Sequence, residues 1–257
     1  MKQKIIAVLN QKGGVGKTTT VINLAAYLAK MGKSVLVVDA DPQSNATSGL
    51  GLERSTLNHT LCDVLLSDVP LANVVQETEM KNLYLLPSDS TLASFEVEVS
   101  NRDNREFYLK EHLNKLIDYD YILIDCPPSL GLITINALVA SRYLLIPVQA
   151  EYYALEGLSQ LLQIMQSVKV ELNKSIELLG VLVTMYDKRT SLSEQVYSEV
   201  GNHFGEKLLR TVIPRNIRLA EAPSFGRPIS EYDRWSKGAK AYKRLAKVVD
   251  SILGGNI

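Results

Sequence analysis

The sequence has little of what marks several common classes of protein. Its 257 residues contain two cysteines, Cys62 and Cys126, which argues against a disulfide scaffold and fits a reducing compartment. No apolar run approaches the roughly 20 residues that a membrane-spanning helix needs. A strand-like segment follows Met1 too soon to leave room for a signal peptide. We therefore expect a soluble cytoplasmic protein.

A net charge is also missing, because Lys+Arg and Asp+Glu both number 28. The overall balance therefore gives no indication of a polyanionic partner. The distribution is uneven, however: residues 205–257 contain 11 basic and 5 acidic side chains, against 17 and 23 in the rest of the chain. An excess of positive charge in the last fifth of the chain requires an explanation.

Repeats, low-complexity tracts and linkers are absent as well, so we expect one domain over residues 1–257. Continuous apolar runs of strand length recur along the chain. Such runs indicate strands that are buried on both faces of a parallel sheet. The predicted strands are Ile5–Leu9, Ser34–Asp41, Asn82–Pro87, Tyr121–Pro128, Tyr143–Gln149, Leu178–Met185 and Leu208–Pro214.

Helical spacing occupies the intervals between these runs. One apolar helix face is formed by Val21, Leu24, Leu28 and Met31, with Gly32 as a stop signal. A second is formed by Leu155, Leu158, Leu161, Leu162 and Met165. Residues 50–61 and 95–105 read as loops or short helices inserted around the sheet. The alternation predicts a doubly wound α/β fold with a mostly parallel sheet flanked by helices.

The first loop has the composition of a phosphate-binding loop. The stretch "NQKGGVGKTTT" (Asn10–Thr20) lies between a predicted strand and a predicted helix. Its glycines let the backbone wrap around phosphate oxygens, and the helix N-terminus favours an anion. We expect Lys17 to reach the β- and γ-phosphates and the Thr18 hydroxyl to bind Mg²⁺. Gln11 occupies a position where the simple Walker A pattern has glycine, so this motif alone leaves open a glycine-rich turn without a ligand.

Three carboxylates follow two other predicted strands. Asp39 and Asp41 lie in "VVDADPQSN", and Asp125 ends the apolar run of "YILIDCPPSLG". Open α/β sheets bind ligands at the carboxyl ends of their strands. Each carboxylate taken alone could simply cap a helix or a turn. Three of them beside a phosphate-binding loop favour a nucleotide site.

The segment "KGGVGKTT" resembles the deviant Walker A motif of the ParA/MinD superfamily, in which a signature lysine precedes the glycine pair. The resemblance implies that two protomers sandwich two ATP molecules and that Lys12 reaches across to the partner's phosphates, as an arginine finger does. It also implies that Asp41 positions the attacking water, that Asp125 holds Mg²⁺ through a water, and that Asp39 supports the same cluster. A solvated loop cation remains the alternative for Lys12.

Further segments resemble the chromosomal ParA proteins, also called Soj. These segments are "DADPQSNATSGLG", "DCPPSLGLITINAL", "IPVQAEYYALEGLSQLL" and "TVIPRNIRLAEAPSFGRPI". "IPRN" is similar to the loop that frames adenine in that family, which implies base contacts by Pro214 and Asn216; alternatively, Pro214 only ends a strand. Because the phosphate-binding loop starts at Asn10, we expect no extra N-terminal DNA-binding domain. The residues expected to contact ATP or ADP are therefore Lys12, Gly13, Gly14, Val15, Gly16, Lys17, Thr18, Thr19, Pro214 and Asn216.

The family resemblance implies an ATP hydrolase that is weak alone and stimulated by a ParB-type partner in partitioning chromosomal DNA. Lys12, Lys17 and Asp41 are the expected catalytic residues, and Thr18, Asp39 and Asp125 the expected magnesium site. Iron–sulfur relatives need cysteines to hold a cluster, and neither Cys62 nor Cys126 has that pattern. The principal alternative function is a MinD-like ATPase that positions division proteins at a membrane.

The C-terminal segment decides between DNA and membrane in this interpretation. A helix at about 236–253 would place its cations within an arc of roughly 120°. The opposite side would hold Ala241, Tyr242, Leu245, Val248, Val249, Ile252 and Leu253. This apolar face has no Phe and includes the small residues Val and Ala, which suits packing on a sheet better than lipid insertion. We expect non-specific double-stranded DNA binding, association with the nucleoid and no stable membrane association. A solvated helix face remains the alternative. The candidate DNA-binding residues are Lys237, Lys240, Lys243, Arg244 and Lys247, with Arg189 and Arg218 added by the resemblance.

Overall fold

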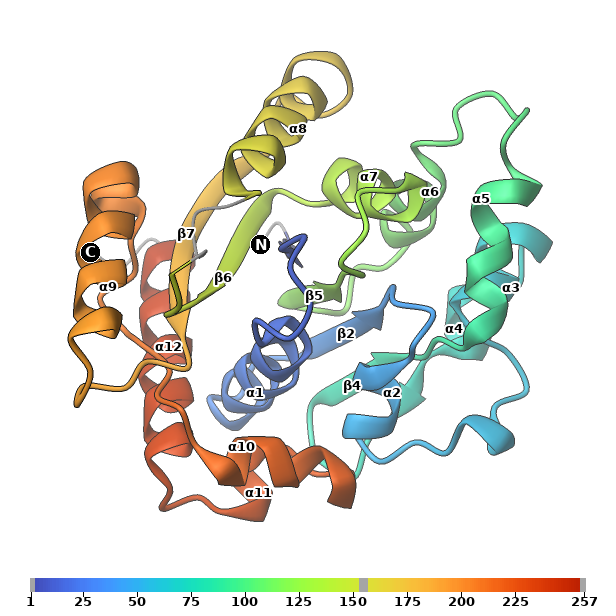
Figure 1. The fold of residues 1–257 in the computed structure, drawn as a ribbon. Coiled ribbons are helices and arrows are strands. Elements are labelled where there is room, and N and C mark those ends of the chain that lie inside the picture. The colour runs from blue at the N-terminus through green and yellow to red at the C-terminus, as the bar shows by residue number, and fades with distance from the viewer. Residues whose placement is uncertain (1–2, 153–156, 255–257) are drawn as a thin grey trace.

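A seven-stranded sheet forms the centre of the molecule (Figure 1). We describe residues 3–152 and 157–254 of a computed structural model. The strand order is β3-β4-β2-β5-β1-β6-β7, and every neighbouring pair is parallel except β3 with β4. The mostly parallel, doubly wound sheet predicted from the sequence is therefore confirmed. The strands are β1 (Lys4–Val8), β2 (Val35–Asp39), β3 (Gln76–Glu77), β4 (Leu83–Leu86), β5 (Tyr121–Asp125), β6 (Tyr143–Gln149) and β7 (Glu177–Thr184).

Helices cover both faces of this sheet, and each face has its own hydrophobic core. Successive residues of a strand enter opposite cores: in β1, Ile5 and Ala7 pack in one and Ile6 and Val8 in the other. This explains why the strands are apolar throughout. On one face lie α1 (Lys17–Lys30), α2 (Asn45–Gly49), α10 (Ile217–Glu221), α11 (Ile229–Tyr232) and α12 (Lys237–Gly254). On the other lie α3 (Leu61–Ser67), α4 (Leu71–Val74), α5 (Phe95–Glu98), α6 (Tyr108–Leu113), α7 (Leu132–Ala140), α8 (Leu158–Glu171) and α9 (Ser191–Phe204).

The strand predicted at Leu208–Pro214 is wrong. The segment runs beside β7, and its amides at Leu209 and Ile213 donate to carbonyls of that strand. It forms no continuous ladder, however: the pairing consists of two isolated bridges, Val181 with Leu208 and Tyr186 with Pro214. Its buried residues Leu209 and Ile213 pin it to the sheet edge, while Arg210 between them is exposed. The apolar residues therefore signal burial at a few points without a continuous ladder. The two-residue strand β3 was not predicted, because Gln76 and Glu77 carry no apolar pattern.

Helix α12 packs along α1, as Figure 1 shows. The hydroxyls of Tyr242 on α12 and Thr20 on α1 form a buried hydrogen bond of 3.1 Å. The apolar side of α12 faces the core, but the predicted arrangement is wrong at Ile252, which is 43% exposed near the helix end. Leu155, predicted on the apolar face of another helix, lies outside the described residues. None of the described helices combines the length and apolar character that crossing a membrane requires.

The backbone passes very close to itself where the loop after α2 meets the 3₁₀ helix η4 (Ala222–Phe225). Gly51 and Gly226 touch there, and both have positive φ angles, +87° and +63°. A Cβ atom added to Gly226 would lie 2.6 Å from the Cα of Gly51. This contact fixes the segment after α2, which follows Asp39 and Asp41 in the sequence, against the segment around Gly226.

Gly226→Ala should lower the free energy of unfolding by about 1–3 kcal/mol or more, because it combines left-handed backbone strain with a backbone clash. Urea unfolding followed by circular dichroism measures the change. Gly254→Ala is the control: a Cβ there meets no atom within 4 Å, and alanine suits a helix. Equal stability of the Gly226→Ala chain and the wild type would contradict the close contact.

Candidate nucleotide-binding site

The loop between β1 and α1 is held in a curved shape that leaves its backbone open to a ligand. Gly14 and Gly16 have φ angles of +74° and +89°, in the region that favours glycine. The Asn10 side chain anchors the loop: its Nδ2 donates to the carbonyl of Pro147 at 2.7 Å, and its Oδ1 accepts from the amide of Lys12 at 3.0 Å. Together with the start of α1, such a loop forms an anion-binding site.

Lys17 lies at the base of this loop and is only 7% exposed. Its ammonium donates to the carbonyl of Lys12 at 3.1 Å, across the curve of the loop. Burial lowers the pKa of Lys17, while the nearby Asp125, Cys126 and Asp41 oppose that shift. A buried ammonium has three donors, so the position suits a phosphate group that could accept from the others.

Asp39 and Asp125 lie side by side at the carboxyl ends of β2 and β5, where they are partners in the strand register. Both are fully buried. One oxygen of Asp39 accepts from the amide and hydroxyl of Thr47 at 2.8 and 2.7 Å, and the other accepts from the amide of Asp41 at 3.2 Å. Burial raises the pKa of Asp39 to about 6. Asp39 thus holds the loop that carries Asp41.

Asp125 has a different environment. Within residues 3–152 and 157–254, neither of its buried carboxylate oxygens has a hydrogen-bond partner. Burial, and then the charge of Asp39, raises the pKa of Asp125 well above its ordinary value. A buried carboxylate without donors is costly, and a cation or its water shell would relieve that cost.

The donor set fits magnesium that arrives with a nucleotide. The described residues contain no group of three His, Cys, Asp or Glu side chains that could hold a metal ion by themselves. Mg²⁺ is usually bound through one or two carboxylates together with phosphates and waters. Thr18 at the start of α1 and Asp125 are protein groups of that kind. Asp39, the third residue expected at the magnesium site, has both carboxylate oxygens engaged by Thr47 and by the amide of Asp41.

Asp41 follows β2 in a tight turn and is 8% exposed. Its Oδ1 accepts from the amide of Gln43 at 2.9 Å, and its carbonyl accepts from the amide of Ser44 at 2.8 Å. The structure therefore brings Lys17, Asp41 and Asp125 to one edge of the sheet, as predicted. This edge is where ligands bind in open α/β folds.

A cavity of about 380 Å³ opens next to Gly16. Pro214 and Asn216, the two residues expected to contact adenine, both line it. The Oδ1 of Asn216 accepts from the amide of Arg218 at 2.9 Å and so caps α10, which leaves its NH₂ group as a donor for a base.

The sequence did not identify Thr184 and Tyr242, which also line this cavity. Thr184 fastens the phosphate-binding loop to β7, because its hydroxyl donates to the carbonyl of Val15 at 2.8 Å. Its place at the end of a predicted strand was the available signal. The sequence pattern placed Tyr242 on an apolar helix face and indicated no other role for it.

Lys12 lies at the rim of the site with its side chain 41% exposed, and its ammonium is 3.6 Å from a carboxylate oxygen of Glu151. Glu151 follows β6 in the family-like segment "IPVQAEYYALEGLSQLL", but the sequence assigned it no role. The lysine is thus neither deeply buried nor simply surrounded by solvent.

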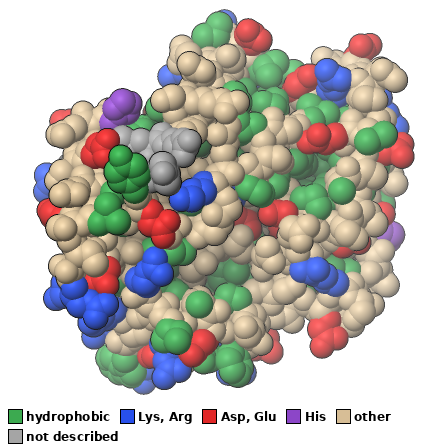
Figure 2. All heavy atoms as spheres, viewed as in Figure 1, with side chains coloured by type: hydrophobic (Ala, Val, Ile, Leu, Met, Phe, Trp, Pro, Cys, Tyr) green, Lys and Arg blue, Asp and Glu red, His purple; other side chains and the backbone are tan. Residues whose placement is uncertain are grey.

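The five cationic side chains of α12 that were predicted for DNA divide between a hollow and its surroundings. The hollow has a volume of about 520 Å³ and is lined by Lys188, Arg189, Arg215, Lys237, Lys240 and Arg244. Lys243 and Lys247 are exposed further along α12, outside the hollow. Figure 2 shows Lys and Arg side chains gathered at this side of the molecule, near the start of α9.

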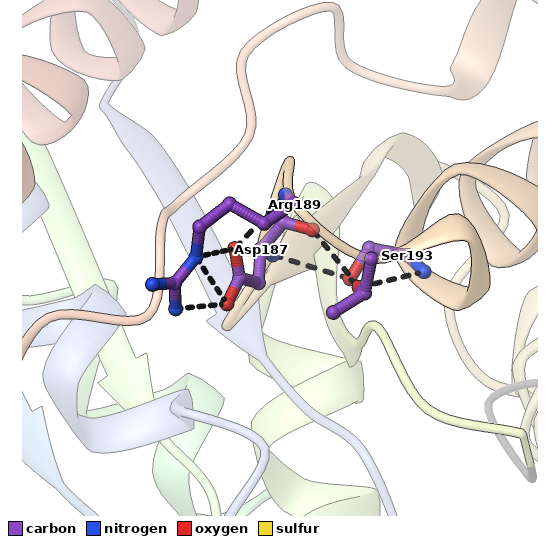
Figure 3. A network of polar contacts seen from close by, with 4 residues as sticks. Asp187, Arg189 and Ser193 are labelled. Carbon is purple, nitrogen blue, oxygen red and sulfur yellow. Dashed lines mark hydrogen bonds and ion pairs between the residues drawn. The ribbon is translucent and has the colours of Figure 1, made fainter.

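Arg189 and Arg218 are paired with carboxylates of their own chain. The Nη2 of Arg189 is 2.7 Å from Oδ2 of Asp187, and its Nε donates to Oδ1 at 2.9 Å (Figure 3). This hydrogen bonding by Arg189 lowers the pKa of Asp187. Arg218 lies apart from the hollow and pairs with Glu221 at 2.9 Å and Asp233 at 3.7 Å. The sequence grouped these arginines together, whereas the fold separates them.

Comparisons with known proteins agree with this geometry. A model of the AAA domain family matches residues 3–178. The sporulation initiation inhibitor protein Soj of Bacillus subtilis (strain 168) is 53% identical over 247 residues, which are 96% of this chain and 98% of that protein. The chain belongs to the ParA/Soj family of chromosome-partitioning ATPases.

Two solved structures that are similar to this ParA/Soj family member contain nucleotide and magnesium. Cobyrinic acid a,c-diamide synthase from Mycobacterium smegmatis, with a bound ATP analogue and magnesium, is 37% identical with a TM-score of 0.89, over 99% of this chain and 97% of that one. The septum site-determining protein MinD complexed with Mg-ADP, from Pyrococcus horikoshii OT3, is 30% identical with a TM-score of 0.81, over 100% and 99%. Because proteins with such different names share this fold, the fold alone does not set the function.

Asp125→Asn should raise the free energy of unfolding of this ParA/Soj-family chain by about 1–3 kcal/mol at pH 8 without nucleotide, because it removes a buried charge whose desolvation the nearby Thr18 hydroxyl and Lys17 offset only in part. The folded-state pKa of Asp125 lies above its unfolded value, so the ionised carboxylate destabilises the fold increasingly as pH rises above about 4. The gain should therefore shrink at pH 5. Urea unfolding at both pH values measures it.

The exposed Asp118 provides the control for this prediction. Asp118→Asn should change stability little at either pH. A loss of stability in Asp125→Asn at pH 8 would mean that the ionised carboxylate is satisfied in the free protein.

Proposed function

We propose that the protein is a Mg²⁺-dependent ATPase that forms an ATP-bound sandwich dimer, binds DNA without sequence preference and partitions chromosomal DNA with a ParB-type partner. The observation that carries the proposal is the shared wall between two hollows: Pro214 and Arg215 line both the cavity next to the phosphate-binding loop and the basic hollow of α12. One short loop thus belongs to the nucleotide site and to the candidate DNA surface.

In this proposal each protomer supplies most of its own site. Lys17 and the loop amides bind the phosphates, Thr18 and Asp125 hold magnesium, and Asp41 positions the attacking water. Bound magnesium would supply positive charge that stabilises the phosphates during transfer. Lys12, at the exposed rim of the loop, completes the site of the partner, where a further positive charge stabilises the transition state.

Dimerisation gives the DNA contact its dependence on ATP. Each protomer presents one basic hollow, so a dimer presents two hollows, and the second contact with the same DNA becomes intramolecular. The gain in avidity turns a weak binder into a stable one. Hydrolysis, stimulated by the partner protein, then returns the chain to the weakly binding monomer.

A division-positioning ATPase at a membrane is the alternative, and α12 argues against it. The apolar residues Ala241, Leu245 and Val249 are buried against the body of the protein, so they are not available to enter a lipid bilayer. Anionic and neutral vesicles, tested in parallel with DNA in the presence of ATP, distinguish these two functions.

Mixing two inactive variants should restore ATP hydrolysis if Lys12 acts across the dimer. In a heterodimer of Lys12→Ala with Asp41→Ala, the Lys12→Ala protomer keeps its own Asp41 and receives Lys12 from its neighbour, so one site is whole. Each homodimer lacks a required group in both sites. Phosphate release from the mixture should therefore exceed the rate of either parent, and native mass spectrometry verifies that heterodimers form.

The control replaces one partner in the mixture. Lys17 acts within its own protomer, so Lys17→Ala mixed with Asp41→Ala leaves each site with one defect and should give no rescue. If Lys12 acted on its own phosphates, the first mixture would likewise stay inactive. No activity above the parents, with heterodimers present, would exclude the trans role.

Arg189→Glu should weaken ATP-dependent DNA binding by about tenfold or more at low salt and reduce the slope of log K against log salt by about 0.9 for each lost phosphate contact. Asp187→Asn should act in the opposite direction, because it removes the carboxylate that neutralises Arg189. Fluorescence anisotropy with two unrelated duplexes across a salt series measures both effects.

Arg102→Glu is the matched charge reversal, at an exposed position in the loop before α6, on the side of the molecule opposite α9 and α12 (Figure 1). It should leave DNA affinity nearly unchanged. ATP-dependent dimerisation should be normal in all three variants. Equal DNA affinity of Arg189→Glu and Arg102→Glu would favour a solvated surface at the hollow.

A further inference from the structure

One carboxylate lies between the phosphate-binding loop and the loop that frames the base cavity. Glu151 follows β6, and its Oε2 is 3.6 Å from the ammonium of Lys12. Its Oε1 is 3.5 Å from Nη2 of Arg215 and also accepts from the side-chain amide of Gln149. Glu151 is therefore held from three sides and pairs with two cations from distant parts of the chain.

We propose that Glu151 restrains Lys12 within its own protomer and thereby opposes dimerisation until nucleotide is bound. This inference rests on the proposed function, in which Lys12 reaches the phosphates of the partner. The ammonium cannot contact Glu151 and the opposite nucleotide at once, so each protomer breaks one such contact as the dimer forms. Glu151 is a positioning residue that acts through Lys12.

The exposure of the pair suits a contact that must break. The side chains of Lys12 and Glu151 are 41% and 43% exposed, and solvent-exposed ion pairs are weak. In the proposed dimer, Lys12 reaches the phosphates of the partner's nucleotide. These carry several negative charges, so they can compete with the single carboxylate of Glu151 for the ammonium of Lys12. Because a two-fold dimer breaks the contact twice, even a weak restraint enters the dimerisation equilibrium as its square.

Arg215 connects the restraint to the nucleotide. It lies between Pro214 and Asn216 and lines the cavity proposed for the base. A base that enters this cavity meets the loop whose arginine holds Glu151. Binding of nucleotide thus acts on the same carboxylate that holds Lys12, and release of the lysine becomes linked to an occupied site.

The first test asks whether the contact restrains Lys12 in the nucleotide-free protein. Labelling of the full chain with an amine-reactive reagent, followed by peptide mass spectrometry, gives a rate for each lysine. Glu151→Gln should raise the labelling rate of Lys12 about two- to fivefold. Glu231→Gln is a closely matched control, because the Lys30–Glu231 pair, at 2.7 Å, is 41% and 46% exposed. It should raise the rate of Lys30 and leave that of Lys12 unchanged.

The second test measures dimerisation by sedimentation with Mg²⁺ and a slowly hydrolysed ATP analogue. Glu151→Gln should lower the protein concentration of half-dimerisation by about four- to twenty-fivefold, the square of the effect on one protomer. Glu231→Gln should not change it. In a Lys12→Ala chain, the Glu151→Gln change should have no further effect, since the restrained group is gone.

The outcomes separate this inference from the proposed function. An unchanged labelling rate of Lys12 in Glu151→Gln, or an unchanged or higher concentration of half-dimerisation, overturns the restraint while the wild type still dimerises with nucleotide. A wild-type chain that stays monomeric with the analogue overturns the sandwich dimer itself, and the restraint with it.

Discussion

The concentration of like charge at one edge of the sheet is the constraint on which the rest of the site depends. Asp39 and Asp125 are fully buried neighbours at the ends of β2 and β5, and two carboxylates so placed resist being ionised together. The surrounding structure gives the two carboxylates different hydrogen-bond partners. Thr47 and the amide of Asp41 satisfy Asp39, whereas Asp125 is left for groups that come from outside the chain. The free protein thus keeps a buried carboxylate that lowers its stability, which is a cost that proteins often bear at functional positions.

Two connections extend this edge toward the C-terminal region. The hydrogen bond between Thr20 and Tyr242 joins the helix that starts at the phosphate-binding loop to the basic helix α12. The loop with Pro214 and Arg215 joins the base cavity to the basic hollow. The basic hollow is therefore formed in part by elements that also form the candidate nucleotide site. This proximity gives a change of nucleotide state a direct route to the surface that carries the cations.

Features that are set by residues adjacent in the sequence could be predicted. Contacts between residues that are distant in the sequence could not. Six strands followed from apolar runs, and Asp39, Asp41 and Asp125 followed from their places at strand ends. Leu208–Pro214 has the same composition, yet it lies at an edge with a discontinuous ladder, which no local pattern records. Arg189 and Arg218 looked equivalent until their partners Asp187 and Glu221 were seen. No role could be predicted for Glu151, because its ion pairs are with Lys12 and Arg215, which are remote in the sequence.

The strand order also determines when, during synthesis, a complete site can exist. The first strand pairs with β5 and β6, so its register from Lys4 to Val8 has no neighbours until residues 121–149 have been made. The cavity next to Gly16, which we propose for the base, is completed later still, because Tyr242 forms part of its wall. A chain that is emerging from a ribosome therefore carries the phosphate-binding loop from the start but gains a full pocket almost last. A nascent fragment that ends before residue 242 would therefore lack one wall of this cavity.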